Sequence, residues 1–291
     1  LSAVAAGFAM TASYGSAMAA GELQLFNWGN YTNPKLIEKF EAAFVLHNAS
    51  DIDNLSSWLD ENGSKIKAIA TNGHDGVKPE VMGALPNLEV ISCYGVGYDA
   101  IDTSEAVRRG IMVTHTPEVL NADVANLAIL LMLAVSRCLV RDDKWVRSGS
   151  WSEKGNAPLT RSIEDKKVGI LGLGRIGSTI ARKLEAFNCE IVYHTRSKKP
   201  EIGYDYYADL VTMANDVDYL VVITPGGEAT NKLVDGQVLD ALGPEGTLIN
   251  VARGSVIDET ELVSALQEGR LGWAGLDVYE DEPNAPEALF N

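Results

Sequence analysis

The sequence is poor in basic residues, cysteine and histidine, and it has no long apolar run. Its 24 Lys and Arg residues stand against 40 Asp and Glu, a net charge of −16. This balance argues against nucleic acid or an anionic membrane surface as a partner, because phosphate contacts require clustered cations. Three widely separated cysteines favour reduced core thiols over a disulfide framework. No Cys/His spacing predicts a zinc site, and we expect no metal. The apolar run from Val124 to Val135 is too short to span a bilayer.

What the chain does contain is a regular alternation of apolar and amphipathic segments from Val45 onward. Its 291 residues, 46% of them hydrophobic, are enough for two separate cores. Amphipathic patterns separate the expected strands, and a long helix is predicted near Asn121 to Ser148. Such alternation predicts an α/β fold with two doubly wound parallel-sheet domains. The expected strands lie in KAIATN, LEVISC, IMVTHT, KVGILGLG, CEIVYHT, VDYLVVITP, GTLINVARG and GWAGLDV.

The start of the chain has a different character. Residues 1–20 are small and apolar and end in an A-x-A pattern, as a secretory signal does, with a loosely ordered leader as the alternative. Leu23 to Phe26 then predicts a strand, and Asn33 followed by Pro34 predicts the start of a helix. Residues 1–44 resemble the beginning of periplasmic polyamine-binding proteins, and this resemblance favours a periplasmic location as the alternative to a cytoplasmic one.

The segment KVGILGLGRIGS carries the most specific motif. Gly172, Gly174 and Gly177 fit G-x-G-x-x-G between a buried strand and a helix. The first glycine permits a tight turn, the second lets the backbone approach a pyrophosphate, and the third lets the helix pack on the strand. Together with Arg175 and Ile176 they are the predicted phosphate-binding residues, because a helix N-terminus offers free N–H groups to an anion. The motif predicts that the second domain is a Rossmann dinucleotide-binding domain.

The strand after this helix is followed by Thr195, at the place where an Asp or Glu would hold a ribose 2′-hydroxyl. An acidic side chain there would repel a 2′-phosphate, whereas the basic segment RSKKP attracts one. We therefore predict NADPH as the preferred cofactor, with NADH possible. A solvated basic loop is the alternative interpretation. The predicted contacts are Arg196, Ser197 and Lys198, with Lys199 next to them.

Five motifs together resemble the D-2-hydroxyacid dehydrogenase family, nearest its hydroxypyruvate, glyoxylate and hydroxyphenylpyruvate reductases. They are CYGVGYDAID, TPEVLNADVANLAI, GILGLGRIG, LINVARGSVIDE and GLDVYEDEP, in family order between Val45 and Asn291. The resemblance implies a cytoplasmic homodimer that reduces small 2-keto acids, such as hydroxypyruvate and glyoxylate, to 2-hydroxy acids with NAD(P)H. It identifies the family and does not select the keto acid.

The resemblance also implies roles for individual residues. Val96 and Gly97 would offer backbone N–H groups to the substrate carboxylate, and Arg253 would bind the carboxylate and the carbonyl oxygen. Asp277 would hold the nicotinamide carboxamide, and Glu282 would pair with the catalytic histidine. The remaining expected nicotinamide contacts are Val124, Thr224, Pro225 and Val251, with Asn121 replacing a more usual threonine nearby.

The proton donor is the one part of this chemistry that the sequence does not supply. The family's catalytic histidine follows the matching glutamate at a position beyond Asn291, and no histidine here follows His194. His74, in TNGHDG, has no evident carboxylate partner and is interpreted as a solvated loop residue. We therefore expect these 291 residues to bind cofactor and to turn over poorly.

The same reasoning predicts the domain organisation. An incomplete substrate domain is expected over residues 21–116, the dinucleotide domain over residues 117–283, and a truncated return segment over residues 284–291. Two other functions are kept as alternatives. One is a non-catalytic dinucleotide-binding fragment, and the other is a periplasmic polyamine-binding module, which only residues 1–44 support.

Overall fold

The computed structural model describes residues 24–27 and 45–290, and the chain divides into two compact units. The predicted signal-like segment and the helix predicted to begin at Asn33 lie outside the described residues. The first unit reaches Thr71 and includes Lys78–Ser92 and Thr103–Thr114, while the second comprises Asn72–Val77, Cys93–Asp102 and the chain from His115 onward. Each unit consists of several segments of the chain, so no single boundary separates the two units. The predicted domain boundaries stay predictions.

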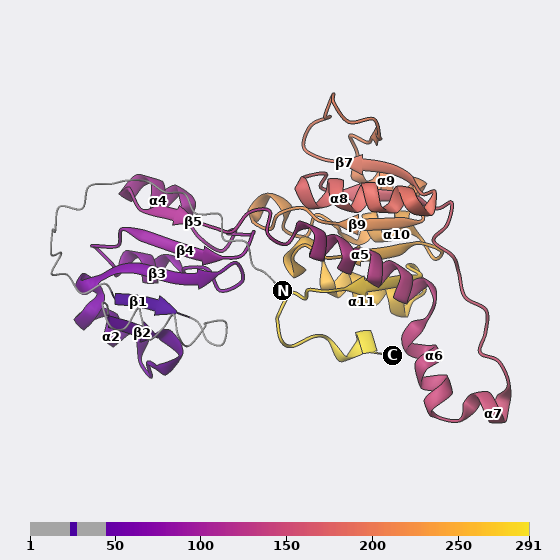
Figure 1. Cartoon of the computed structure of the whole chain (residues 1–291), viewed down its shortest axis with the longest axis horizontal. Coiled ribbons are helices and arrows are strands. Elements are labelled where there is room, and N and C mark those ends of the chain that lie inside the picture. The colour runs from indigo at the N-terminus through magenta and orange to yellow at the C-terminus, as the bar shows by residue number, and fades with distance from the viewer. Residues whose placement is uncertain (1–23, 28–44, 291) are drawn as a thin grey trace, which may run out of the picture. The chain divides into compact units, whose positions relative to one another are not determined.

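The first unit is built on a five-stranded sheet in the order β2-β1-β3-β4-β5 (Figure 1). β1 runs parallel to both β2 and β3, and β4 runs parallel to β5. The strand predicted at Leu23 to Phe26 is confirmed one residue further along. The strands are β1 Gln24–Asn27, β2 Val45–Asn48, β3 Ile66–Asn72, β4 Val90–Tyr94 and β5 Met112–Thr114, and the helices are α2 Leu55–Asn62, α3 Pro79–Gly83 and α4 Thr103–Arg109.

The second unit contains a six-stranded parallel sheet in the order β11-β10-β9-β6-β7-β8. Counted within the unit, this is the order 6-5-4-1-2-3 of a Rossmann sheet, whose direction of winding reverses between β6 and β9. The predicted fold class is therefore confirmed. The strands are β6 Lys167–Leu171, β7 Glu190–His194, β8 Asp205–Tyr206, β9 Tyr219–Val222, β10 Thr247–Asn250 and β11 Trp273–Leu276.

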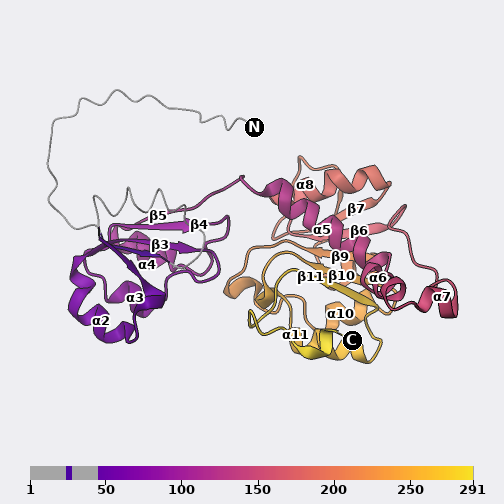
Figure 2. The same cartoon turned by 60° about the horizontal axis from the view of Figure 1, so that its bottom comes forward.

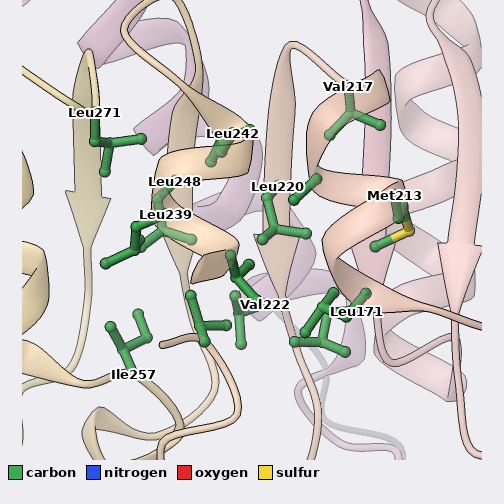
Figure 3. Packing of buried hydrophobic residues seen from close by; sticks show 14 of the residues in the cluster. Leu171, Met213, Val217, Leu220, Val222, Leu239, Leu242, Leu248, Ile257 and Leu271 are labelled. Carbon is green, nitrogen blue, oxygen red and sulfur yellow. The ribbon is translucent and has the colours of Figure 1, made fainter. Parts of the chain in front are cut away.

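Helices cover both faces of this sheet (Figure 2). α5 (Asn121–Ser136) and α8 (Arg175–Leu184) pack on one face, and α9 (Leu210–Asp216), α10 (Gly236–Leu242) and α11 (Glu259–Gln267) pack on the other. Successive side chains of a strand point to opposite faces. Leu220 and Val222 of β9 therefore join the core under α9 and α10 (Figure 3), while Tyr219 and Val221 join the core under α5.

The prediction of one long helix near Asn121 to Ser148 is wrong. α5 ends at Ser136, Cys138 takes a left-handed φ of 49°, and α6 (Leu139–Arg147) continues at a bend of 57° before α7 (Ser150–Lys154). Beside this break, the buried Ser136 Oγ donates to the Met132 carbonyl oxygen at 2.6 Å and lies 2.7 Å from Tyr219 Oη of β9. No single described helix has the length and apolarity of a membrane span, and α5 and α6 reach them only as this bent pair.

Candidate active site

The turn between β6 and α8 has the geometry of a phosphate-binding loop. Gly172 has a φ of +103°, and a Cβ atom there would lie 2.9 Å from the backbone nitrogen of Thr224. A Cβ at Gly177 would lie 2.1 Å from the carbonyl oxygen of Gly172, so glycine lets α8 begin this close to the strand. A Cβ at Gly174 would meet nothing within 4 Å. The space beside the N-terminus of α8 is therefore open where the motif expects a pyrophosphate.

A cavity of about 610 Å³ opens beside this loop. Its volume lies in the usual range for cofactor and small-molecule sites. Six of the predicted cofactor residues line it: Gly172, Gly174, Arg196, Ser197, Thr224 and Pro225. The others lie outside its lining: Arg175, Ile176, Gly177, Lys198, Val124, Val251 and Asp277. The cavity thus joins the glycine loop to the basic corner, as a dinucleotide requires, and the individual contacts stay predictions.

The basic corner follows β7 at the far end of this cavity. Thr195 replaces the usual acid, and its hydroxyl donates a hydrogen bond of 2.8 Å to the Ser197 carbonyl oxygen. Lys199 lines the cavity and donates from Nζ to the Leu173 carbonyl oxygen at 2.7 Å, whereas Lys198 is exposed and is not among the lining residues. Lys199 is therefore better placed than Lys198 to face a bound nucleotide, and Arg196 and Ser197 also line the cavity.

The predicted nicotinamide residues follow the carboxyl ends of neighbouring strands. Thr224, Val251 and Asp277 come directly or shortly after β9, β10 and β11, whose parallel pairing brings these ends to one edge of the sheet. The Asp277 backbone N–H donates to the Asn250 carbonyl oxygen at 3.0 Å. Partial desolvation raises the pKa of the Asp277 carboxyl, and the nearby charge of Glu282 raises it further. Val124 packs against the core under α5.

Arg253 and the Gly95–Gly97 loop, which the sequence predicts to hold the substrate, lie directly against each other in the second unit. A Cβ atom on Gly97 would lie 1.8 Å from Arg253 Nη2. The guanidinium is held by Asp99, with Nε 3.2 Å from Oδ2 and Nη2 3.1 Å from Oδ1. Sequence reasoning did not single out Asp99, although it lies inside the quoted motif CYGVGYDAID.

The Gly95–Gly97 loop is braced by the residues that follow β5. His115 Nδ1 lies 3.0 Å from the Val96 carbonyl oxygen. Gly95 and Thr116 exchange two hydrogen bonds, from Gly95 N–H to Thr116 Oγ1 at 3.1 Å and from Thr116 N–H to the Gly95 carbonyl oxygen at 2.9 Å. Sequence reasoning missed this bracing, because nothing in the spacing of HT and GVG predicts their contact.

Glu282 lies beside a histidine that the sequence analysis set aside. Its Oε1 accepts a hydrogen bond of 3.0 Å from the Tyr279 N–H, and its Oε2 lies 3.7 Å from His74 Nδ1. The expectation that His74 has no carboxylate partner is therefore wrong, although its side chain is 62% exposed, as a solvated residue would be. Asn72 shapes the turn, because its Oδ1 accepts from the N–H groups of His74 and Asp75, each at 2.8 Å.

A Rossmann sheet with an open glycine loop is typical of a dinucleotide-dependent enzyme, and an arginine set against a second glycine loop is able to bind an anion. Comparison with known proteins agrees. Residues 129–291 match the family model of the D-isomer specific 2-hydroxyacid dehydrogenase, NAD binding domain. The chain belongs to the D-2-hydroxyacid dehydrogenase family and is an oxidoreductase that binds a nicotinamide dinucleotide, as the motifs predicted.

Individual relatives are similar over most of their length. Glyoxylate/hydroxypyruvate reductase A of Arabidopsis thaliana is 49% identical over 81% of this chain and 75% of that protein. Hydroxyphenylpyruvate reductase of Plectranthus scutellarioides is 44% identical over 94% of this chain and 85% of that protein. The crystal structure of an NADPH-dependent glyoxylate/hydroxypyruvate reductase from Sinorhizobium meliloti with NADP and malonate has a TM-score of 0.82 at 42% identity, covering 93% of this chain and 84% of that one.

Proposed function

We propose that this protein reduces small 2-keto acids, with hydroxypyruvate and glyoxylate as the leading substrates, and that it prefers NADPH to NADH. The observation that carries the cofactor preference is Thr195 at the end of β7, followed by Arg196 and Ser197 in the cavity lining. A carboxylate at this place would repel a 2′-phosphate, whereas a guanidinium and a hydroxyl bind one. The relative from Sinorhizobium meliloti, which is described as NADPH-dependent, supports the same preference.

The chemistry of the reduction divides between cofactor and protein. A bound nicotinamide supplies the hydride. Arg253 and the backbone N–H groups of Val96 and Gly97 bind and orient the 2-keto acid, since an arginine matches a carboxylate and a neighbouring carbonyl oxygen. We assign the proton on oxygen to a histidine paired with Glu282, as the family resemblance implies. Among the described residues, His74 lies 3.7 Å from Glu282 and is one candidate for this role.

An assay of NADPH oxidation with hydroxypyruvate or glyoxylate tests the proposal. We expect turnover of both acids, faster with NADPH than with NADH. His74→Gln tests whether His74 donates the proton, because turnover should be unchanged if another histidine pairs with Glu282. Loss of turnover in folded His74→Gln would assign the donor to His74, and no turnover of either acid with either cofactor would contradict the proposal.

Two alternatives are tested by ligand binding together with the same assay. If the protein binds NADPH and reduces neither acid, it is a non-catalytic dinucleotide-binding module. A periplasmic polyamine-binding function predicts heat on titration with putrescine, and we expect none, because the resemblance to such binders is confined to residues 1–44. We also propose a cytoplasmic location, where NADPH is available, and cell fractionation with an antibody against the chain checks it.

We propose further that two copies associate through α6 and α7. α6 has no buried residue in the described chain, and several large apolar side chains around it are more than half exposed. Exposed apolar side chains gathered on one projecting segment mark an interaction surface, and α6 and α7 extend away from the sheet in Figure 1. The side chains are those of Leu139, Val140, Val146, Trp151 and Leu159.

A further inference from the structure

We propose that Asp99 is a positioning residue that fixes the plane of the Arg253 guanidinium, so that its two remaining N–H groups are aimed at the substrate. This inference rests on the proposed function, because it takes the 2-keto acid as the ligand of Arg253. Asp99 follows the Gly95–Gly97 loop and is 154 residues away from Arg253 in sequence. Their contact is therefore made by the fold of the second unit.

The hydrogen bonds of Arg253 show which of its N–H groups are available to a substrate. A guanidinium has five N–H groups in one plane. In Arg253 the Nε–H and one Nη2–H donate to Asp99 at 3.2 and 3.1 Å, and one Nη1–H donates to the Ala252 carbonyl oxygen at 2.8 Å. One N–H on Nη1 and one on Nη2 have no acceptor among residues 24–27 and 45–290. These two form the end fork of the guanidinium, which matches two oxygen atoms held side by side.

A 2-keto acid presents such a pair of oxygen atoms, one from the carboxylate and one from the adjacent carbonyl group. With the side fork of Arg253 occupied by Asp99, a substrate meets only the end fork. The Asp99 carboxylate thereby selects one orientation of the guanidinium, and hence one orientation of the carbonyl group. Correct placement of the reacting carbon is worth large rate factors, because misplacement by about 1 Å costs roughly a hundredfold.

Two glycines show that this pair is enclosed closely. A Cβ at Gly97 would lie 1.8 Å from Arg253 Nη2 and 2.9 Å from Asp99 Oδ1, and a Cβ at Gly226 would lie 2.6 Å from Asp99 Oδ2. The ion pair thus packs closely against two glycines, Gly97 and Gly226, where a side chain would collide with it. The exposed fraction of the side chain is 34% for Arg253 and 20% for Asp99, so solvent screens this pair less than it screens most surface pairs.

Substitution of Asp99 distinguishes two roles for this ion pair. If the pair only stabilised the fold, the substitution would not change which ligand is preferred, whereas a pair that orients a ligand would lose that preference. Asp99→Asn keeps the shape of the side chain but replaces one acceptor oxygen with an NH₂ group, which cannot accept from Arg253. The guanidinium then loses one of its two hydrogen bonds to residue 99. The net charge of the pair changes from zero to +1, because the carboxylate is gone. Charge alone would strengthen the binding of every anion. Loss of orientation would weaken only the ligand that needs two oxygens in register.

The experiment measures the dissociation constants of hydroxypyruvate and 3-hydroxypropionate for the NADP⁺ complex by calorimetry. The two acids have the same charge and differ in the carbonyl oxygen, and no hydride donor is present. In the wild type we expect hydroxypyruvate to bind roughly tenfold or more tightly than 3-hydroxypropionate. In Asp99→Asn we expect this ratio to fall at least about fivefold, with 3-hydroxypropionate bound as well as before or better.

Two further variants complete the design. Asp240→Asn removes a carboxylate from another Asp–Arg pair of the second unit, with Arg270, and should leave the ratio unchanged. Gly226→Ala displaces the Asp99–Arg253 pair without changing its charge, and should lower the ratio as Asp99→Asn does, even if the latter variant folds poorly. A ratio in Asp99→Asn or in folded Gly226→Ala within about twofold of the wild type would overturn the role of Asp99. No preference for hydroxypyruvate in the wild type would instead overturn the proposed function on which it rests.

Discussion

Replacement of two glycines in the G-x-G-x-x-G motif by alanine should have different effects. One replacement should lower the stability of the protein, and the other should lower its affinity for NADPH. In Gly177→Ala the new Cβ would lie 2.1 Å from the Gly172 carbonyl oxygen and 3.3 Å from Ile223 Cγ2. The first distance is more than an ångström inside ordinary contact, and the obstructing atom is backbone. Overpacking of this kind costs about 1–3 kcal/mol. For a chain of this size that corresponds to a fall of about 2–12 °C in melting temperature.

Gly174→Ala is the matched counterpart. Its Cβ would meet no atom of the described residues within 4 Å, and Gly174 has a φ of −81°, which alanine adopts freely. The melting temperature should therefore stay close to that of the wild type. The new methyl group would project into the space where the pyrophosphate is expected, so the dissociation constant for NADPH should rise roughly tenfold, or about 1.4 kcal/mol.

Thermal unfolding followed by circular dichroism, and NADPH titration followed by fluorescence, measure the two effects separately. The reasoning requires that Gly177→Ala loses stability, and that Gly174→Ala keeps stability and loses affinity. It would be refuted by a stable Gly177→Ala, or by a Gly174→Ala variant that binds NADPH within about twofold of the wild type.

Three further predictions address the cofactor, the assembly and the titration of the site. Thr195→Asp should weaken NADPH binding roughly tenfold or more and leave NADH binding little changed, because the new carboxylate repels the 2′-phosphate; fluorescence titration with both cofactors checks this, and equal losses would contradict it. Val140→Glu combined with Trp151→Ala should convert a dimer into monomers in sedimentation velocity without lowering the melting temperature, and an unchanged dimer would place the interface elsewhere. The fold raises the Asp277 pKa, so the stability tied to this carboxyl is present below its unfolded pKa and is lost as the pH rises through its folded pKa. The melting temperature of Asp277→Asn should therefore rise relative to that of the wild type as the pH increases from about 4 to about 7. A constant difference between the two melting temperatures would show that the carboxyl does not titrate in this way.

The parts of the fold that the sequence predicted are those governed by local chemistry. The strand at Lys167–Leu171 and the glycines after it form one short segment, whose apolar run and turn residues specify the structure without help from distant residues. The strand at Tyr219–Val222 is buried on both faces, and its continuous apolar run identifies it as a parallel strand. The strand at Thr247–Asn250 is equally buried, although its first and last residues are polar. β8, with two residues, is too short to leave a periodic pattern.

The end of α5 is not signalled by the sequence. Neither glycine nor proline lies between Ser136 and Leu139, so the helical pattern continues through the break. The break is a left-handed conformation at Cys138, which non-glycine residues adopt rarely. Ser136, the last residue of α5, contacts Tyr219, which is 83 residues further along the chain, so the surroundings of this end depend on tertiary packing.

The residues of the candidate site also divide into those that a local motif predicts and those that depend on distant contacts. The glycine loop and Arg253 lie in motifs with a recognisable order of residues, so their types and places were predictable. Asp99, His115 and His74 act through contacts with residues that are distant in sequence, so their partners follow only from the three-dimensional structure. Lys199 rather than Lys198 lines the cavity because a loop has no fixed period from which the orientation of a side chain follows.

A crystal structure with bound NADP⁺ tests the central claim most directly, which is that the glycine loop and the basic corner after β7 together hold a phosphorylated adenosine. We predict the pyrophosphate against Gly174 at the N-terminus of α8, and the 2′-phosphate within hydrogen-bonding distance of Arg196 or Ser197. Density for the nucleotide with its adenosine away from Arg196, or an empty cavity at saturating NADP⁺, would contradict the account.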